Sequence, residues 1–350
     1  MSRAFTLTVE EPGRIGRQEL PPQALAPNEV RLATLYSGIS AGTEMTAFLG
    51  TSPYLAKRWT PEVRLFRPGV ASMTYPHPAI GYEEVGRVTE IGAAVTGVAV
   101  GQVVWGQWQH RSERIVDEDY AAARILPEGV DPRLGIFSQI GAIALNAVID
   151  ADIHVGEYVA VFGQGVPGLL VTMFAIANGA TVIAVDRHAE RLAVSRACGA
   201  RHTVDASKED AAEVIKQLTG GRGADVSIEM SGSYPALQTA IRATAYNSRV
   251  VVSGYFQGES HGLFLGEEFH HNRIDLVCSQ IFGLSPRVDH RWDRLRLDQT
   301  AMALISEGRI DAGRLITHVI PVARAQEAFD MLRERPHEAL QVVLDFTETA

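Results

Sequence analysis

A glycine-rich turn between a predicted strand and a predicted helix constrains this chain more than any other feature. The run YVAVF is typical of a buried strand, and Gly163, Gly165 and Gly168 follow it with the spacing G-x-G-x-x-G before an apolar helical run. The first glycine permits a tight turn, the second lets the backbone approach a pyrophosphate, and the third permits close packing of helix on strand. Val166 and Pro167 lie within the same turn and are candidate cofactor contacts. The pattern predicts a dinucleotide site at a helix N-terminus.

An acidic residue at the end of the next predicted strand indicates which dinucleotide binds. The run TVIAV ends at Asp186, eighteen residues beyond Gly168, where a carboxylate can accept hydrogen bonds from an adenosine ribose diol. That carboxylate would repel the extra phosphate of NADP, so NAD is the expected cofactor. Arg187 could pair with such a phosphate, but we expect it to reach solvent or to stack on adenine. The alternative is a glycine turn in a sheet that binds no ligand.

The stretch from Tyr158 to Val185 contains no charged residue and is long enough to span a bilayer. Its glycines and the pair Asn178-Gly179 divide it into strand, turn, helix and strand, so no membrane segment is expected. The first residues lack the charged block and apolar block of a signal peptide, which favours a cytoplasmic location.

The chain of 350 residues is long enough for two domains. Short β-type runs separated by Gly and Pro turns predominate up to about Asp119, and the clearest are 29–40, 83–92 and 102–108. From Arg133 to about Gln280, strand-like runs alternate with helical runs, which predicts βαβ units and a parallel sheet.

Charge and cysteine content exclude several function classes. The 32 Lys and Arg against 41 Asp and Glu give a net charge of −9, so neither a nucleic acid nor an anionic membrane is expected as a partner. Cys198 and Cys278 are too few for a disulfide framework or a four-cysteine zinc lobe. We expect both to be small core residues in a reducing compartment.

Over nearly its full length the chain resembles the medium-chain dehydrogenase/reductase family, the alcohol dehydrogenase-like group. The resemblance is carried by the glycine turn with Asp186 and by the segments IGYEEVGRVTEIGAAVTGVAVGQVVWG, ERLAVSRACGARHTVD, GADVSIEMSG, RVVVSGY and LITHVIPVARAQEAFDML. It implies an α/β protein with a β-rich, GroES-like catalytic domain at 1–135, completed by 286–350. A Rossmann domain with a doubly wound parallel sheet would occupy 136–285.

The resemblance also implies where the ligands bind. In this family the cleft between the domains holds nicotinamide and substrate, and dimers form through the edges of the Rossmann sheets, so a homodimer is expected. Relatives often place a basic residue near the cofactor pyrophosphate where this chain has Gln341. The strand-end residues that would face the cofactor are Ser231, Gly232, Ser253, Gly254, Ser279 and Gln280.

The chain departs from the family at the positions where other members bind catalytic zinc. Ser40 or Ala41, Tyr82, and Ser138 or a neighbour stand there, and none has the thiolate, imidazole or carboxylate that zinc prefers. Glu83 alone could not hold the ion, so we expect no metal. The string SGISAGTE and the tyrosine at 82 resemble a zinc-free branch that includes bacteriochlorophyllide hydroxyethyl dehydrogenases, without implying their tetrapyrrole substrate.

Polar side chains must then replace the metal in stabilising an alkoxide. The candidates for catalysis are Tyr82, as a hydrogen-bond donor to the substrate oxygen, and Glu83, as a carboxylate that tunes or relays the proton. Ser40, Thr43 and Glu44 border the same site. Alternatively, Tyr82 fills the vacated metal position, Ser40 and Thr43 hydrogen-bond the turn, and Glu83 pairs with a buried arginine.

The connection 45–80 is longer than in the zinc enzymes and mixes aromatic residues with Lys and Arg. Long loops with such content often cover or bind substrates, and a surface excursion or dimer contact is the equal alternative. For His77, His110 and the pair His270-His271, a structural role is favoured over metal binding or general-base catalysis.

The leading hypothesis is an enzyme, a zinc-independent, NAD-dependent oxidoreductase acting on CH–OH. It would interconvert a secondary alcohol and a ketone on a fairly large polar small molecule, such as a sugar, glycoside, cyclitol or ring-borne hydroxyethyl group. The alternatives are an enoyl or quinone reductase of the same family and a non-catalytic NAD-binding protein.

Overall fold

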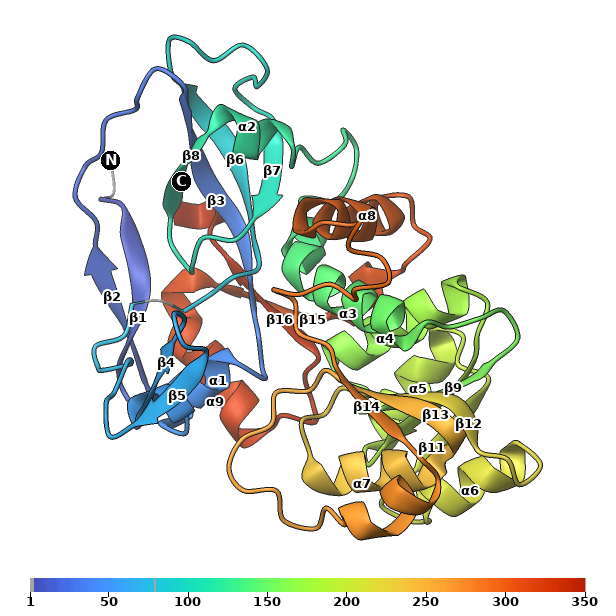
Figure 1. Cartoon of the computed structure of the whole chain (residues 1–350). Helices are drawn as coiled ribbons and strands as arrows, with labels where there is room; N and C mark the ends of the chain where they lie inside the picture. Colours follow the sequence, from blue (N-terminus) through green and yellow to red (C-terminus); the bar gives the residue numbers. More distant parts are fainter. Residues whose placement is uncertain (1–2, 79, 350) are drawn as a thin grey trace. The chain divides into compact units, whose positions relative to one another are not determined.

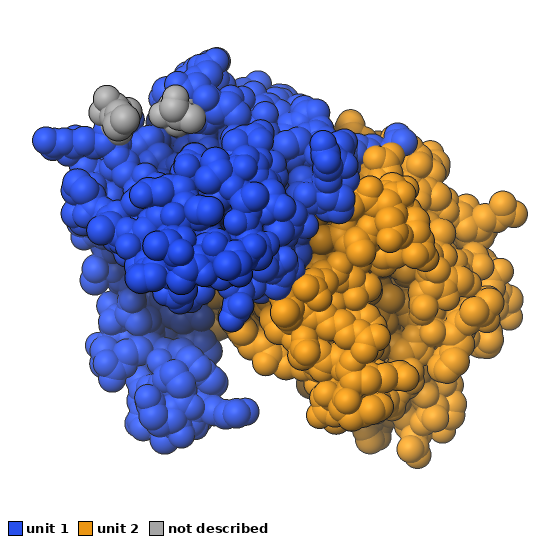
Figure 2. Space-filling model, turned by 90° about the horizontal axis from the view of Figure 1, so that it is seen from above, with its two compact units in different colours: residues 1–139, 313–350 blue, residues 140–312 orange. Residues whose placement is uncertain are grey.

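A computed structural model describes residues 3–78 and 80–349, and the chain forms two compact units (Figures 1 and 2). Unit 1 comprises residues 1–139 and 313–350, and unit 2 comprises residues 140–312. The segment 286–312, expected in the first domain, therefore belongs to unit 2. The reason is that Ala301 and Ile305 of α8 (Arg294–Ser306) lie against Gly141 of α3 (Phe137–Ala151).

Unit 2 is built on a six-stranded parallel sheet with the order β11-β10-β9-β12-β13-β14 (Figure 1). The strands are β9 (Tyr158–Phe162), β10 (Thr181–Asp186), β11 (His202–Asp205), β12 (Ala224–Glu229), β13 (Thr244–Val252) and β14 (Asp275–Cys278). The connecting helices are α4 (Val166–Ala177), α5 (Ala189–Ala197), α6 (Ala211–Leu218), α7 (Tyr234–Ala243) and the short π-type η3 (Leu265–Phe269). The strand order reverses between β9 and β12, which is the switch point where doubly wound sheets bind ligands.

The long uncharged stretch resolves as predicted into β9, a glycine turn, α4 and β10. Its apolar residues are needed because β9 and β10 lie inside the sheet and helices cover them. By length and composition alone, one helical stretch among the described residues, Pro132–Ala151, could cross a membrane, and 83% of it is buried inside the protein as a core helix would be.

Unit 1 contains a mostly antiparallel sheet with the order β15-β16-β3-β6-β7, and β8 also pairs with β3. The strands are β3 (Glu29–Ile39), β6 (Glu84–Ile91), β7 (Val103–Gly106), β8 (Glu113–Asp117), β15 (Ile316–Pro321) and β16 (Gln341–Asp345). Helices α1 (Glu44–Leu49), α2 (Glu118–Ala122) and α9 (Ala325–Glu334) complete the unit with short 3-10 turns at Pro53–Leu55, Pro132–Ile136, Ala312–Leu315, Val322–Arg324 and Thr347–Thr349. The parallel Rossmann sheet of unit 2 and the β-rich unit 1 together confirm the predicted α/β fold class.

Both ends of the chain contribute to unit 1. In the pairing of β16 with β3, Val342 lies opposite Ile39 and Val343 opposite Gly38. The core beneath includes the aromatic pair Phe48 and Phe329, whose ring centroids are 5.2 Å apart. This packing fixes the end of β3, where the candidate catalytic residues begin.

Two hairpins were not predicted from the sequence. One is β1 (Phe5–Glu11) with β2 (Arg14–Glu19), and the other is β4 (Lys57–Thr60) with β5 (Leu65–Pro68) inside the long connection. Mixed charges and aromatics hide the strand period in the second hairpin. The prediction for the cysteines was wrong as well, since Cys278 on β14 is exposed and Cys198 is only half-buried.

Candidate active site

The glycine turn of unit 2 has the geometry that a dinucleotide turn requires. Gly163 directly follows β9 and has a φ of +89°, a left-handed conformation that favours glycine. A Cβ on Gly168 would lie 1.8 Å from the carbonyl oxygen of Gly163, so no side chain fits between helix and strand there. Gly165 caps α4, and Val166 and Pro167 are its first residues. Gly163 and Gly165 thus form the turn, and the other three residues open α4, whose first backbone N–H groups have no partner within the helix.

Asp186 lies at the end of β10, beside this turn, and is 8% exposed. Its carboxylate accepts hydrogen bonds from the backbone N–H groups of Gln164 at 2.6 Å, Arg187 at 2.7 Å and His188 at 2.9 Å. A carboxylate has about four acceptor positions, so one remains for a ribose hydroxyl. Arg187 is exposed, in agreement with its expected access to solvent.

The other predicted cofactor residues lie at the carboxyl ends of neighbouring strands. One buried side chain, Glu229 at the end of β12, accepts hydrogen bonds from the N–H groups of Ser231 at 2.8 Å and Gly232 at 3.1 Å. Its carbonyl oxygen binds the N–H groups of Ser253 and Gly254, both at 3.0 Å. The Ser253 hydroxyl oxygen is buried without a hydrogen-bond partner in the described part of the chain, as expected for a group that awaits a ligand.

The residues after β14 belong to the same edge of the sheet. The N–H of Ser279 donates to the carbonyl of Val252 at 3.0 Å, which extends the pairing of β13 with β14 by one residue. The Gln280 side chain instead accepts from the N–H of Phe282 at 2.7 Å. An edge with a left-handed glycine turn, an acid beside it and an unpartnered hydroxyl fits a dinucleotide.

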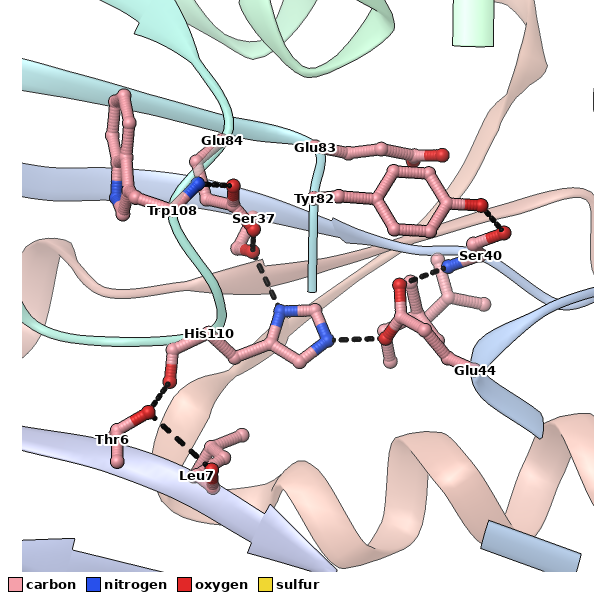
Figure 3. A network of polar contacts seen from close by, with 12 residues as sticks. Thr6, Leu7, Ser37, Ser40, Glu44, Tyr82, Glu83, Glu84, Trp108 and His110 are labelled. Atoms are coloured by element: carbon pink, nitrogen blue, oxygen red, sulfur yellow. Dashed lines mark hydrogen bonds and ion pairs between the residues drawn. The ribbon is translucent and has the colours of Figure 1, made fainter. Parts of the chain in front are cut away.

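In unit 1, three of the predicted catalytic residues gather where β3 ends and β6 begins (Figure 3). The Tyr82 hydroxyl donates to the Ser40 hydroxyl oxygen in a short hydrogen bond. Burial raises the pKa of Tyr82, and the charges of Glu83 and Glu44 raise it further, although hydrogen bonds with Ser40 and Thr43 act in the opposite direction. Tyr82 therefore keeps its proton at physiological pH and can donate it.

Glu83 is fully buried and faces Gln341 of β16 rather than an arginine. The Gln341 side-chain amide donates to the Glu83 carboxylate and to the Ile39 carbonyl, both at 3.2 Å. Burial raises the pKa of Glu83 well above its usual range, and the nearby charges of Glu44 and Glu84 add to the shift. The Gln341 amide, whose place near the cofactor pyrophosphate stays an expectation, therefore binds Glu83, and the alternative of an arginine partner for Glu83 is not seen among the described residues.

His110, for which a structural role was favoured from the sequence, lies at the centre of a second buried network. Its Nε2 is 2.7 Å from Oε2 of Glu44, and its Nδ1 is 2.6 Å from the Ser37 hydroxyl (Figure 3). The other Glu44 oxygen accepts the Ser40 backbone N–H at 3.0 Å, which links this network to the first. His270 and His271 contact each other edge-on, with ring centroids 5.6 Å apart.

The residues present do not fit a zinc ion. Ser40 and Tyr82 offer hydroxyls that bind each other, and the Ser138 hydroxyl is buried without a partner in the described part of the chain. Glu83 is engaged by Gln341. Within residues 3–78 and 80–349, no group of three or more His, Cys, Asp or Glu side chains could hold a metal ion.

Sequence reasoning did not identify Ser37 and Glu84 as members of the site, and it did not predict that His110 would contact Glu44 and Ser37. A signal for Glu84 existed, because two adjacent acids at the start of an apolar strand cannot both face solvent. Ser37 and His110 gave no such signal, since their partners come from segments distant in sequence.

The fold and the two sites define a class of protein. Its members combine a Rossmann unit of the type that binds nicotinamide dinucleotides with a β-rich unit that contains buried acids. The chain belongs to the medium-chain, zinc-type alcohol dehydrogenase-like family. The family described as zinc-binding dehydrogenase matches residues 167–295.

Several relatives share nearly the whole chain. D-guloside 3-dehydrogenase of Escherichia coli is 30% identical over 336 residues, which covers 94% of this chain and 96% of the relative. The solved structure of 2R,3R-butanediol dehydrogenase from Bacillus subtilis has a TM-score of 0.78 at 22% identity and covers 98% of this chain and 99% of its own. A Sinorhizobium meliloti protein described as a zinc-binding dehydrogenase, in a structure bound to NADP, has a TM-score of 0.76 at 22% identity. The match covers 99% of this chain and 100% of that protein.

Proposed function

We propose that the protein is a zinc-independent, NAD-dependent oxidoreductase that interconverts a secondary alcohol and a ketone on a polar small molecule. The observation that carries the proposal is the Tyr82–Ser40 hydroxyl pair beside buried Glu83, at the position where a metal would otherwise polarise the substrate. The guloside relative supports a sugar-type substrate, and a glycoside, cyclitol or ring-borne hydroxyethyl group fits the same chemistry. Turnover of a panel of polyols and glycosides with NAD, in the presence of a chelator, tests it.

The chain's own residues supply the acid–base chemistry. The bound nicotinamide supplies the hydride acceptor. Tyr82 holds its proton because burial and two nearby carboxylates disfavour the phenolate, so it stabilises a developing alkoxide by donating a hydrogen bond. Without substrate this single proton goes to Ser40, so it would turn from Ser40 to the substrate oxygen, and the Ser40 hydroxyl could then donate to the phenol oxygen and orient it. Glu83, whose pKa is raised, can hold or release the proton that accompanies hydride transfer.

Asp186 supports NAD over NADP, because its carboxylate is fixed by three backbone N–H groups at the end of β10. We expect the wild-type protein to bind NADH at least about tenfold more tightly than NADPH. Asp186→Asn should raise the Kd for NADH about tenfold, because one charge-assisted hydrogen bond to the ribose would be lost. Fluorescence titration with both cofactors measures this.

Asp205→Asn is the matched control for the cofactor experiment. Asp205 ends β11 directly opposite Asp186 in the strand register, and we place no cofactor contact there. It should leave both Kd values unchanged. Equal affinity of the wild-type protein for NADPH and NADH would contradict the NAD assignment.

The β4–β5 hairpin is a candidate for substrate recognition. It exposes Trp59 and Phe66, whose ring centroids are 5.1 Å apart, and Arg58 lies directly opposite Arg67. Neither arginine makes an ion pair in the described part of the chain, so both guanidinium groups can bind a ligand. A covering loop of this kind would contact the substrate rather than the cofactor.

Excision of the hairpin tests this role. The N–H of Gly69 donates to the carbonyl of Ala56 at 3.0 Å, so a one- or two-glycine link can replace residues 57–68. We expect the substrate KM to rise about tenfold or more with an unchanged Kd for NADH. An altered oligomeric state in gel filtration, with unchanged KM, would assign the hairpin to a dimer contact instead. We propose a homodimer through the free edge of β14, which pairs only with β13 among the described strands.

A further inference from the structure

Four buried side chains of unit 1 form one hydrogen-bonded chain that the proposed chemistry does not use (Figure 3). Glu44 Oε2 meets His110 Nε2 at 2.7 Å, and His110 Nδ1 meets the Ser37 hydroxyl at 2.6 Å. The Ser37 hydroxyl also lies 2.9 Å from Oε1 of Glu84. The second Glu84 oxygen accepts the backbone N–H of Trp108 at 2.5 Å. None of the four side chains is more than 4% exposed.

The hydrogens of this hydrogen-bonded chain can be arranged in two ways that satisfy the same contacts. In the first, doubly protonated His110 donates to Glu44 and Ser37, and Ser37 donates to ionised Glu84. In the second, protonated Glu84 donates to Ser37, and Ser37 donates to neutral His110. One proton changes sides through the Ser37 hydroxyl without movement of any heavy atom, and the net charge is the same in both arrangements. One further proton neutralises the whole chain.

The surroundings of His110 leave only acids to control its charge. Glu44 of α1 and Glu84 of β6 are the charged groups that act on the ring. The other elements around it are uncharged: Ser37 of β3, Thr6 and Leu7 of β1, Phe329 of α9 edge-on at 6.1 Å, and Ile80 and Gly81 before Tyr82. Burial lowers the pKa of His110, but Glu44 and Glu84 more than compensate and raise it. Burial raises the pKa of Glu84 to about 7.

The hydrogen-bonded series of Glu44, His110, Ser37 and Glu84 contacts the candidate catalytic residues through Glu44. Its Oε1 accepts the Ser40 backbone N–H at 3.0 Å, and Ser40 accepts the Tyr82 hydroxyl. A backbone N–H does not pass a proton onward, so the coupling between the two networks is electrostatic and positional. When the hydrogen-bonded series carries less negative charge, ionisation of Tyr82 costs less free energy and its pKa falls.

We propose that His110, Ser37 and Glu84 form a proton switch, whose net charge acts through Glu44 on Ser40 and Tyr82. His110 and Glu84 are then positioning residues, because they act on the reaction through other side chains. For its effect on turnover, this inference rests on the proposed oxidoreductase function. The switch itself is a property of unit 1 and can be observed without a substrate.

NMR titration of the full-length protein tests the switch directly. Two interacting groups release their protons in two macroscopic steps, so the ¹⁵N resonances of His110 should move in two steps between about pH 6 and 10. Glu84→Gln leaves His110 as the one titrating group of the switch, and its ¹⁵N resonances should then move in a single step. The matched control is Glu90→Gln on the same strand, where the exposed side chain pairs with Arg31, and it should keep two steps. A single step in the wild-type protein would overturn the proposal even where the variant does not fold.

Turnover provides the second arm of the test. As the switch loses protons with rising pH, kcat for ketone reduction should fall about tenfold, the effect of one pKa unit at Tyr82. Glu84→Gln should remove part of this fall, with an unchanged Kd for NADH. If kcat of Glu84→Gln depends on pH as kcat of the wild-type protein does, the switch is not coupled to Tyr82. Absence of turnover with every substrate rejects the proposed function alone, because the NMR arm still decides on the switch.

Discussion

Gly168→Ala should abolish useful cofactor binding, with an increase in the Kd for NADH of about 100-fold, or about 2.7 kcal/mol. The added Cβ would lie 1.8 Å from the carbonyl oxygen of Gly163, so α4 must move away from the end of β9. That movement withdraws the helix N-terminus from the phosphates. The same displacement should lower the free energy of unfolding by about 1–3 kcal/mol, as overpacking of a tight contact does. Fluorescence titration and chemical denaturation measure the two effects.

Gly266→Ala is the control for this variant. Gly266 lies in the same unit, and a Cβ there would meet no atom within 4 Å. It should bind NADH as the wild-type protein does. If Gly168→Ala also retained the wild-type Kd for NADH, the glycine turn would not be the dinucleotide site. The alternative, a glycine turn in a sheet that binds no ligand, would then hold.

Tyr82→Phe should lower kcat about 100-fold or more while the Kd for NADH stays unchanged. The substitution conserves the ring and removes only the hydroxyl that donates to Ser40. A positioned proton donor contributes about 10²–10⁴-fold to rate, and no metal ligand set among the described residues would compensate for its loss. Steady-state kinetics on the best substrate of the polyol panel, with chelator present throughout, give the value.

The control for this experiment is Tyr246→Phe. Tyr246 is 65% exposed on β13 of unit 2, so the loss of its hydroxyl should change neither kcat nor stability by more than the error of measurement. A Tyr82→Phe protein within twofold of the wild-type kcat would show that Tyr82 only fills space. Zinc-dependent recovery of activity in either protein would contradict the metal-free proposal.

The Rossmann unit was predictable because its signals are local. Strand and helix periods alternate from β9 to β14, and the turn at Gly163 and the acid at Asp186 need no distant partner to be recognised. The boundary near 286 was not, since α8 joins unit 2 through packing of Ala301 and Ile305 on α3. The β4–β5 hairpin escaped notice because every residue of β5 is exposed, and a hydrophobic face is what marks a strand.

The candidate catalytic site was predictable only in part. Tyr82, Glu83 and Ser40 follow from the positions that a metal would occupy in the family. His110 and Ser37 depend on contacts between segments 73 residues apart, and Gln341 reaches Glu83 across 258 residues. Periodicity and local motifs carry no information about such partners, which arise only when the sheet of unit 1 is assembled.

The pairing of β16 with β3 has a consequence for the order in which the protein folds on the ribosome. Unit 2 is continuous and can fold once residue 312 has emerged. The last part of β3 must wait for the final strand, since β16 pairs with residues 36–39. Until then the edge of β3 lacks its neighbour, and Glu83 lacks the amide of Gln341. The nascent chain can therefore acquire a folded cofactor unit before its catalytic acids are in place, and loss of the final ten residues should cost catalysis before it costs dinucleotide binding.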